Sequence, residues 1–153
     1  MKRLKTSWRI CLIQSSLAVL IVFLVLLLIN IENVVVVVAV GASAFIVFAM
    51  PDSSTASAKN IIGGHLLSFF VGSICALIPQ TCFWCSLAAQ SIAVGLAIFV
   101  MVIVGVGHPP AAATELGISI NGFSMDGGIA LITSVVCLAI AHHYLKPFLR
   151  NIV

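Results

Sequence analysis

The stretch Gly107-His108-Pro109-Pro110-Ala111-Ala112-Ala113-Thr114-Glu115-Leu116 decides how this chain folds. Proline has no N–H group to donate, and its fixed φ suits the first turn of a helix, so the stretch predicts the end of one helix and the start of another. The residues on both sides are almost entirely apolar. A broken helix at membrane depth is tolerated only where it is buried in protein or lines a cavity. The stretch is therefore the first candidate for a functional site.

The composition around this stretch is that of a polytopic membrane protein. Hydrophobic residues make up 62% of the 153 residues and charged residues only 7%, whereas soluble domains contain about 25% charged residues. The polar loops are too short to bury a core of their own, so we expect one membrane domain over residues 1–153. Its main partner is then the lipid bilayer, and we expect no nucleic-acid partner.

Five long apolar runs predict membrane-spanning helices, because a helical crossing needs about 20 apolar residues. They are residues 10–29, 34–50, 61–78, 83–106 and 127–145. The first run is too long for the core of a signal peptide, which has about 7–15 residues, so we expect a retained span. Residues 108–120 add a short helix after the break. The predicted fold class is thus an all-α membrane bundle with five long spans and a short broken-helix segment.

The positive charges favour an orientation with both termini in the cytoplasm. If the apolar runs cross alternately and residues 108–120 also cross, all seven Lys and Arg residues fall on one side, whereas Glu32 and Asp126 fall on the other. The positive-inside rule places the basic side in the cytoplasm. We therefore expect a cytoplasmic tail at 1–9, a bundle at 10–145 and a second cytoplasmic tail at 146–153, in a bacterial inner membrane.

Small residues suggest two halves with three membrane elements each. Gly63-Gly64 and Gly127-Gly128 open the third element of each half, and Gly41-Ala42-Ser43-Ala44 interrupts the middle element of the first half. An odd number of crossings in each half would make the repeats inverted, a common transporter plan. Gly64, Ser68 and Gly72 recur at four-residue spacing and predict close helix contacts.

These segments resemble the signature blocks of the HPP family of integral membrane proteins, in the expected order over about residues 10–145. The blocks are the 107–116 stretch, Gly41-Ala42-Ser43-Ala44, Pro51-Asp52-Ser53 and Asn60-Ile61-Ile62-Gly63-Gly64-His65-Leu66-Leu67-Ser68. The resemblance implies a small multi-span protein with about four spanning helices, and nitrite transport in some members. The chain departs from the family pattern at Ala112, where glycine is usual, and at Glu115, where an apolar residue is usual.

The His108-Pro109-Pro110 segment has two interpretations. As a site, a helix start would direct unpaired N–H groups and its positive dipole end at a small anion, and a protonated His108 would add charge. Ala111, Ala112 and Ala113 would leave room for the anion beside the backbone. In the alternative interpretation the segment is a proline kink capped by histidine. The family resemblance favours the site.

Thr114 and Glu115 extend this candidate site. An ionisable residue within a membrane segment is costly to insert and indicates a function by default. As a carboxylate Glu115 would repel an anion, whereas as a protonated acid it could donate a hydrogen bond or carry a proton with the substrate. Alternatively, Glu115 reaches interfacial water.

The second and third apolar runs and their polar loop complete the candidate site, with Asp52, Ser53, Asn60 and His65 as a gate or second wall on the cytoplasmic side. The candidate residues are Gly41, Ser43, Asp52, Ser53, Asn60, Gly63, Gly64 and His65. Helix capping is the alternative for Asn60, which suits an N-cap position, and a turn after Pro51 is the alternative for Asp52.

The four histidines and five cysteines give weaker signals. No tight ligand spacing or carboxylate cluster accompanies His65, His108, His142 and His143, so we expect no metal and no cofactor. Cys82 and Cys85 have a redox-motif spacing without the βαβ pattern that accompanies it. A local disulfide or two free thiols is the simpler expectation.

The sequence thus predicts a membrane transporter or channel for a small inorganic anion, with nitrite implied by the resemblance and with proton coupling through Glu115. We do not expect an enzyme, and no glycine-rich nucleotide loop is present. A homo-oligomer suits a chain of this length. Two alternatives stay open: a histidine-based metal or haem redox protein, and a membrane assembly subunit that transports nothing.

Overall fold

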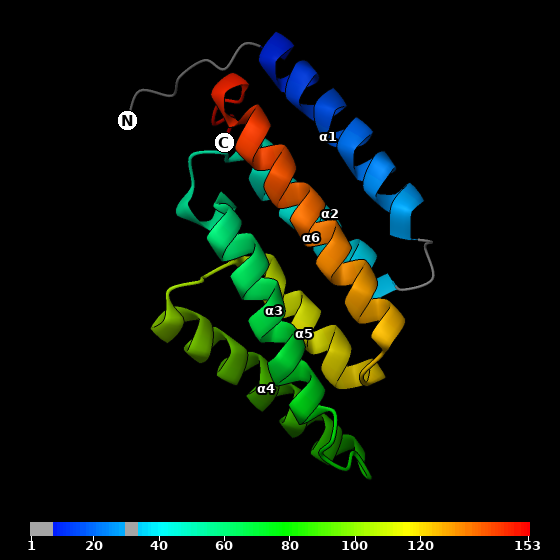
Figure 1. Cartoon of the computed structure of the whole chain (residues 1–153). Helices are drawn as coiled ribbons and strands as arrows, with labels where there is room; N and C mark the ends of the chain where they lie inside the picture. The colour runs from blue at the N-terminus through cyan, green and yellow to red at the C-terminus, as the bar shows by residue number, and fades with distance from the viewer. Residues whose placement is uncertain (1–7, 30–33) are drawn as a thin grey trace.

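The computed structural model describes residues 8–29 and 34–153, which form six α-helices and no strand (Figure 1). The helices are α1 (Trp8–Ile29), α2 (Val34–Ala49), α3 (Ala58–Cys75), α4 (Phe83–Val104), α5 (Pro109–Asn121) and α6 (Met125–Leu145), with 3-10 turns η1 (Ser54–Ala56) and η2 (Lys146–Phe148). An all-α bundle with a short helix after the His-Pro-Pro break is confirmed. The predicted 30–33 turn with Glu32, and Lys2, Arg3 and Lys5 of the basic tail, lie outside the described residues.

Four described helices, rather than the five expected, are long and apolar enough to cross a membrane. They are Trp8–Leu28, Ala58–Cys75, Phe83–Val104 and Met125–Phe148. The prediction of five long spans is wrong because the second apolar run forms a helix of only 16 residues. At 1.5 Å per residue such a helix is about 24 Å long, shorter than the hydrocarbon core of roughly 30 Å.

The helix contacts keep the same pattern when the first three helices are exchanged with the last three. The main contacts are α1–α2, α1–α6, α2–α5, α2–α6, α3–α4, α3–α5, α3–α6 and α4–α5. Exchanging α1 with α4, α2 with α5 and α3 with α6 reproduces this set of pairs. Each half also has its shortest helix in the middle, and α1 and α4 lie on opposite flanks of the bundle in Figure 1.

Small residues let α3 approach α5 closely, as their spacing predicts. A Cβ atom added to Gly64 would lie 2.8 Å from His108 Cβ, and one added to Gly72 would lie 2.8 Å from the carbonyl oxygen of Glu115. Ser68, one turn from each glycine, is fully buried. The small-residue spacing therefore brings the backbones of the two helices together, as in other membrane helix pairs.

The distribution of polarity suits a lipid environment. Large apolar side chains cover the outside of the bundle, including Leu27, Phe99 and Val102, which are each more than half exposed. Among the residues whose burial the structure describes, ten buried ones are polar or charged: Gln14, Ser43, His65, Ser68, His108, Thr114, Glu115, Ser119, Ser134 and His142. Exposed apolar surface of this extent marks contact with a membrane or a partner.

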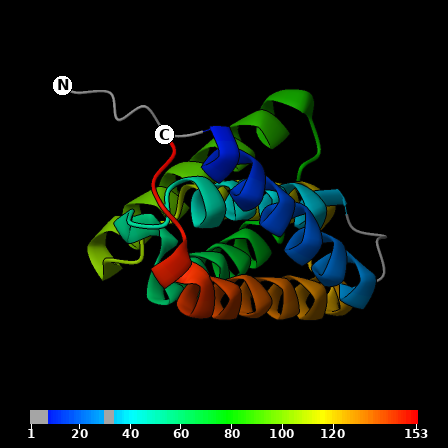
Figure 2. The same cartoon turned by 90° about the horizontal axis from the view of Figure 1, so that it is seen from above.

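The C-terminal segment runs from the end of α6 towards the start of α1 (Figure 2). The Gln14 side-chain amide donates to the Arg150 carbonyl oxygen at 2.9 Å, and its oxygen accepts from the Arg150 N–H at 3.1 Å. His142 Nε2 donates to the Pro51 carbonyl oxygen at 2.9 Å, and Ile152 N–H donates to the Ala49 carbonyl oxygen at 3.0 Å. These bonds gather the start of α1, the α2–α3 loop and the C-terminus at one end of the bundle.

Candidate functional site

The link between α4 and α5 brings His108 into the bundle. Gly105 ends α4 at a φ of 70°, a left-handed conformation that glycine adopts without steric cost. His108 then occupies the N-cap position, and Pro109 and Pro110 form the first turn of α5 as predicted. Asn60 Nδ2 donates to the Gly107 carbonyl oxygen at 3.0 Å, so the link is held against the start of α3.

The start of α5 does not offer the row of unpaired N–H groups that the sequence suggested. Pro109 and Pro110 have no N–H, and the Ala111 N–H donates to the His108 carbonyl oxygen at 2.9 Å. The imidazole of His108 does not cap the helix either. An anion at this helix start would therefore depend on the helix dipole and on side chains rather than on these backbone donors.

The His108 side chain instead belongs to a continuous chain of hydrogen bonds across three helices. His108 Nδ1 lies 2.8 Å from the Thr55 carbonyl oxygen, and His108 Nε2 lies 3.0 Å from Ser43 Oγ. Ser43 Oγ lies 2.9 Å from His65 Nε2, and His65 Nδ1 lies 2.8 Å from Thr114 Oγ1. We call Thr114, His65, Ser43 and His108 the histidine–hydroxyl chain; each of its side chains is at most 1% exposed.

Each member of this chain comes from an element that the sequence pointed to. Ser43 lies on α2, His65 on α3 and Thr114 on the second turn of α5. The two imidazole rings meet edge to face, with ring centroids 5.0 Å apart. Gly64 allows this arrangement, because its missing side chain leaves room for His108 beside α3.

The Thr55 carbonyl oxygen sets the direction of the hydrogen bonds. A carbonyl can only accept, so His108 Nδ1 must donate, and the Nε2 of a neutral His108 must accept from the Ser43 hydroxyl. Ser43 Oγ then accepts from His65 Nε2, and His65 Nδ1 accepts from the Thr114 hydroxyl. All four side chains are then satisfied with both imidazoles neutral, the arrangement that a buried polar site favours.

The loop before α3 contributes to this chain through the Thr55 carbonyl oxygen. Ser57, not Asn60, is the N-cap of α3, because its side chain accepts from the Asn60 N–H at 3.4 Å. Ser53 caps η1, the turn that carries the Thr55 carbonyl. Asp52 is exposed, and its N–H donates to Asn151 Oδ1 at 3.2 Å.

Several predicted site residues are not part of the histidine–hydroxyl chain. Gly41 lines a groove beside α1 that also contains Gln14 and Phe45. Gly63 lies against Val106, with the position of an added Cβ 2.8 Å from Val106 Cγ1. Pro110 and Ala111 are buried, Ala112 is half-buried, and Pro109 and Ala113 are exposed.

Glu115 follows Thr114 in the sequence but has different surroundings. It is completely buried, so it does not reach interfacial water as one interpretation suggested. Neither carboxyl oxygen has a hydrogen-bond partner in the described part of the chain, and the same holds for the hydroxyl of Ser68. A buried carboxylate without a partner is costly, so Glu115 is the least satisfied polar group in the bundle interior.

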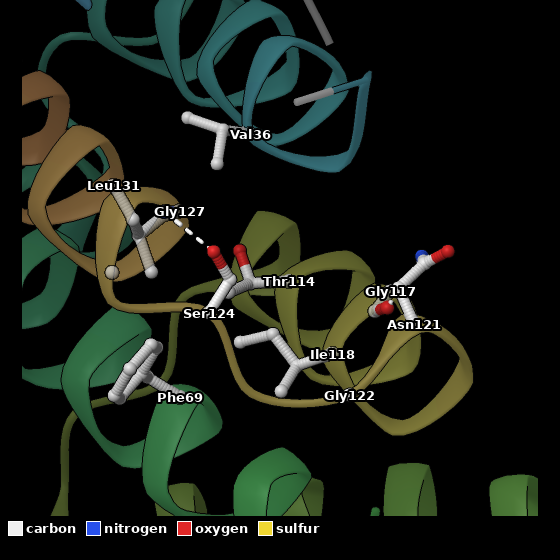
Figure 3. Close-up of a pocket in the computed structure, with 11 residues that line it drawn as sticks. Val36, Phe69, Thr114, Gly117, Ile118, Asn121, Gly122, Ser124, Gly127 and Leu131 are labelled. Atoms are coloured by element: carbon white, nitrogen blue, oxygen red, sulfur yellow. Dashed lines mark hydrogen bonds between the residues drawn. The ribbon is translucent and has the colours of Figure 1, made fainter. Parts of the chain in front are cut away.

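Two pockets border the two ends of the histidine–hydroxyl chain. The first has a volume of about 30 Å³ and is lined by Thr114 together with Asn121 and Ser124 of the α5–α6 turn. Figure 3 shows Thr114 of α5 beside Ser124 of the α5–α6 turn at the wall of this pocket, with Val36 of α2 above them. The second is a groove of about 350 Å³ that is lined by Thr55, His108 and Pro109 with residues of α4. We call them the Thr114 pocket and the His108 groove.

Other sulfur and nitrogen groups do not form a metal centre in the described residues. No three His, Cys, Asp or Glu side chains there lie close enough to hold a metal ion. Both ring nitrogens of His65 and of His108 are already engaged in hydrogen bonds. Cys82 and Cys85 form a disulfide at the start of α4, which confirms one of the two simple expectations for this pair.

Some contributors to the site have no side-chain signal in the sequence. The Thr55 carbonyl acts through its backbone, and the role of Asn121 and Ser124 follows only from how α5 and α6 meet. His142, on the last turn of α6, is buried, and its Nε2 donates to the Pro51 carbonyl oxygen. Contacts of this kind, between a loop and a buried polar side chain of a helix, can be recognised only when the positions of the helices are known.

Six helices with lipid-compatible outer faces around a buried polar chain define a polytopic helical membrane protein. The particular family is the HPP transmembrane family, to which this chain belongs: the family model described as "HPP, transmembrane region" matches residues 2–149. A transmembrane protein of Dictyostelium discoideum is 40% identical over 77 residues, which cover 49% of this chain and 26% of that protein. The chain therefore spans about a quarter of the length of this curated relative. No solved structure matches the chain.

Proposed function

We propose that this protein moves a small inorganic anion across a membrane, with nitrite as the first candidate. Membership of the HPP transmembrane family is consistent with a transporter. The observation that carries the proposal is the histidine–hydroxyl chain, buried where α2, α3 and α5 meet. Ionisable residues such as histidine are rare inside membrane bundles, and they mark substrate, ion and proton pathways.

In this proposal α1–α3 and α4–α6 are inverted halves, and both termini face the cytoplasm of a bacterium. The exchangeable helix contacts support two related halves, and transporters of this plan bind their substrate where the halves meet. Lys59, Lys146 and Arg150 lie at the end that carries the C-terminus, whereas Asp126 starts α6 at the other end. The Cys82–Cys85 disulfide also lies at that other end, which suits an oxidising outer face.

The His108 groove is the cytoplasmic opening of the anion path in this proposal. Of the two histidines in the histidine–hydroxyl chain, His108 is the one that lines this groove, and a protonated imidazole there would attract an anion. The close approach of Gly64 and Gly72 to α5 leaves no room for an anion to pass between the two helices in this conformation. Passage then requires α3 and α5 to separate, as in a rocking motion of the two halves.

The test is nitrite uptake into liposomes that contain the purified protein, with empty liposomes as the background. We expect uptake above background, reduced by competing anions that share the site, with chloride and formate as the probes. His108→Ala should bring uptake to background, whereas His143→Ala should not, because His143 is exposed on α6. Uptake that is equal with and without protein would refute the proposal. Mass measurement of the purified protein tests the proposed homo-oligomer separately.

A further inference from the structure

We propose that the histidine–hydroxyl chain is a proton relay that joins the Thr114 pocket to the His108 groove. The relay deepens the proposed function, because it makes the proton the ion that is coupled to anion movement, and in that respect it rests on the proposed function. Proton movement through the relay itself does not depend on which anion the protein carries.

The continuity of the hydrogen bonds is the first support for the relay. All four contacts from Thr114 Oγ1 to the Thr55 carbonyl oxygen measure 2.8–3.0 Å. Hydroxyl and imidazole groups can both donate and accept, so each member can receive a proton on one side and release one on the other. Histidine is also the side chain whose protonation changes most readily near neutral pH.

The positions of the two ends are the second support. The Thr114 pocket is lined by residues of the α5–α6 turn, and its volume of about 30 Å³ is enough for at least one water molecule beside Asn121 and Ser124. The His108 groove is lined by η1 and the start of α5, elements of the opposite end. A proton that travels along the relay would therefore move from one end of the bundle towards the other.

The packing around the relay is the third support. The four side chains are at most 1% exposed, and an added Cβ atom on Gly64 would touch both His108 Cβ and Ala111 Cβ. This packing closes the path to water and to larger ions. A chain of hydroxyl and imidazole groups could still pass protons, because no group has to leave its place.

The transfer balances with one proton entering and one leaving. A proton from water reaches Thr114 Oγ1, and the Thr114 hydroxyl proton passes to His65 Nδ1. His65 Nε2 gives its proton to Ser43, Ser43 gives its own to His108 Nε2, and His108 Nδ1 releases its proton to water in the His108 groove. Only O–H and N–H bonds form and break.

The relay then has to reset before a second proton can follow. After one transfer the bare Nδ1 of His108 faces the Thr55 carbonyl oxygen, and two acceptors repel each other there. The Thr114 and Ser43 hydroxyls must turn, and both imidazoles must move their proton to the other ring nitrogen. Such a reset needs space that the packed rings lack, so it would accompany separation of α3 from α5 and link one proton to one transport cycle.

Charged groups near the relay are few in the described residues. Glu115 is buried next to Thr114 in the sequence without a hydrogen-bond partner. Lys59 Nζ approaches Gly105 of the α4–α5 link, with 3.8 Å to the position of an added Cβ. His142, from α6, is bound to the Pro51 carbonyl oxygen rather than to the relay.

The test measures proton movement into liposomes with an internal pH-sensitive dye, after a pH step and with the membrane potential clamped by potassium and valinomycin. Nitrite is absent in one series and present in the other. Ser43→Ala removes the central oxygen of the relay, so we expect its proton flux in the presence of nitrite to fall to that of empty liposomes. Ser134→Ala is the matched control, because Ser134 is also buried but its hydroxyl donates to the Ala130 carbonyl oxygen at 2.6 Å.

A second pair of variants covers the case in which Ser43→Ala does not fold. Thr114→Val keeps the shape of the side chain without the hydroxyl and should lose proton flux, and Thr114→Ser returns the hydroxyl and should conduct more than Thr114→Val. Wild-type proton flux in Ser43→Ala or in Thr114→Val would overturn the relay. Nitrite uptake without any proton flux would also overturn it but leave the proposed function standing. Proton flux that depends on Ser43 without nitrite uptake would support the relay and reject nitrite transport.

Discussion

The two faces of α5 differ in how their polar groups are satisfied. Towards α2 and α3, Thr114 completes a hydrogen-bonded chain in which every donor has an acceptor. At the next residue, Glu115 is equally buried but lacks a hydrogen-bond partner among the described residues. The difference teaches that burial of a polar residue in a membrane helix does not define its role, because its partners decide whether it stabilises the fold.

The largest loss of stability is expected from His65→Ala, which removes hydrogen bonds on the side of α5 that faces α2 and α3. The substitution removes the ring between Ser43 and Thr114 and leaves a cavity where both lose a partner. Large-to-small substitutions in packed cores cost about 2–5 kcal/mol, and we expect a loss of unfolding free energy in that range. Denaturant unfolding in detergent measures the loss, with His143→Ala as the control on the exposed side of α6. Equal stabilities of the two variants would contradict a structural contribution of the chain.

A smaller effect is expected from Gly64→Ala, which tests the close approach of α3 to α5. The added Cβ would lie 2.8 Å from His108 Cβ and 3.1 Å from the Val106 carbonyl oxygen. Overpacking of this kind costs about 1–3 kcal/mol. Gly41→Ala is the matched control, because nothing lies within 4 Å of its added Cβ. If thermal unfolding shows the same midpoint for both variants, the contact between α3 and α5 is looser than described.

The smallest effects, of opposite sign, are expected from a pair of variants at neighbouring residues. Thr114→Val breaks a satisfied hydrogen bond and should destabilise the protein by about 1 kcal/mol. Glu115→Met replaces an unpartnered carboxyl group with an apolar side chain and should stabilise it by about 1 kcal/mol or more. Unfolding of the two variants in the same detergent compares them directly. A marked loss of stability in Glu115→Met would show that Glu115 has a partner.

The sequence was sufficient for the helices, and it singled out the four residues that the structure joins in the histidine–hydroxyl chain. Proline chemistry predicted the break before Pro109 and the short helix after it, and the five apolar runs predicted the other five helices. Ser43, His65, His108 and Thr114 were all candidates, because polar side chains stand out in an apolar chain. The spacing of Gly64, Ser68 and Gly72 also predicted close helix contacts, and the structure shows that the partner is α5.

The sequence was not sufficient for features that depend on how helices are placed. The run after residue 33 is apolar up to Met50, but its helix ends at Ala49 and is too short for a full span. Thr114 and Glu115 point about 100° apart, since a helix turns once in 3.6 residues, and only packing decides which of them meets His65. The Thr55 carbonyl belongs to the backbone, which no side-chain pattern reveals.

The measurement that tests the account most directly is nitrite uptake into protein-containing liposomes with and without an imposed pH gradient. The account predicts uptake above that of empty liposomes, and faster uptake when the side that supplies nitrite is more acidic. It also predicts that Ser43→Ala loses this acceleration and Ser134→Ala keeps it. Uptake that equals the empty-liposome background at every gradient would contradict the account.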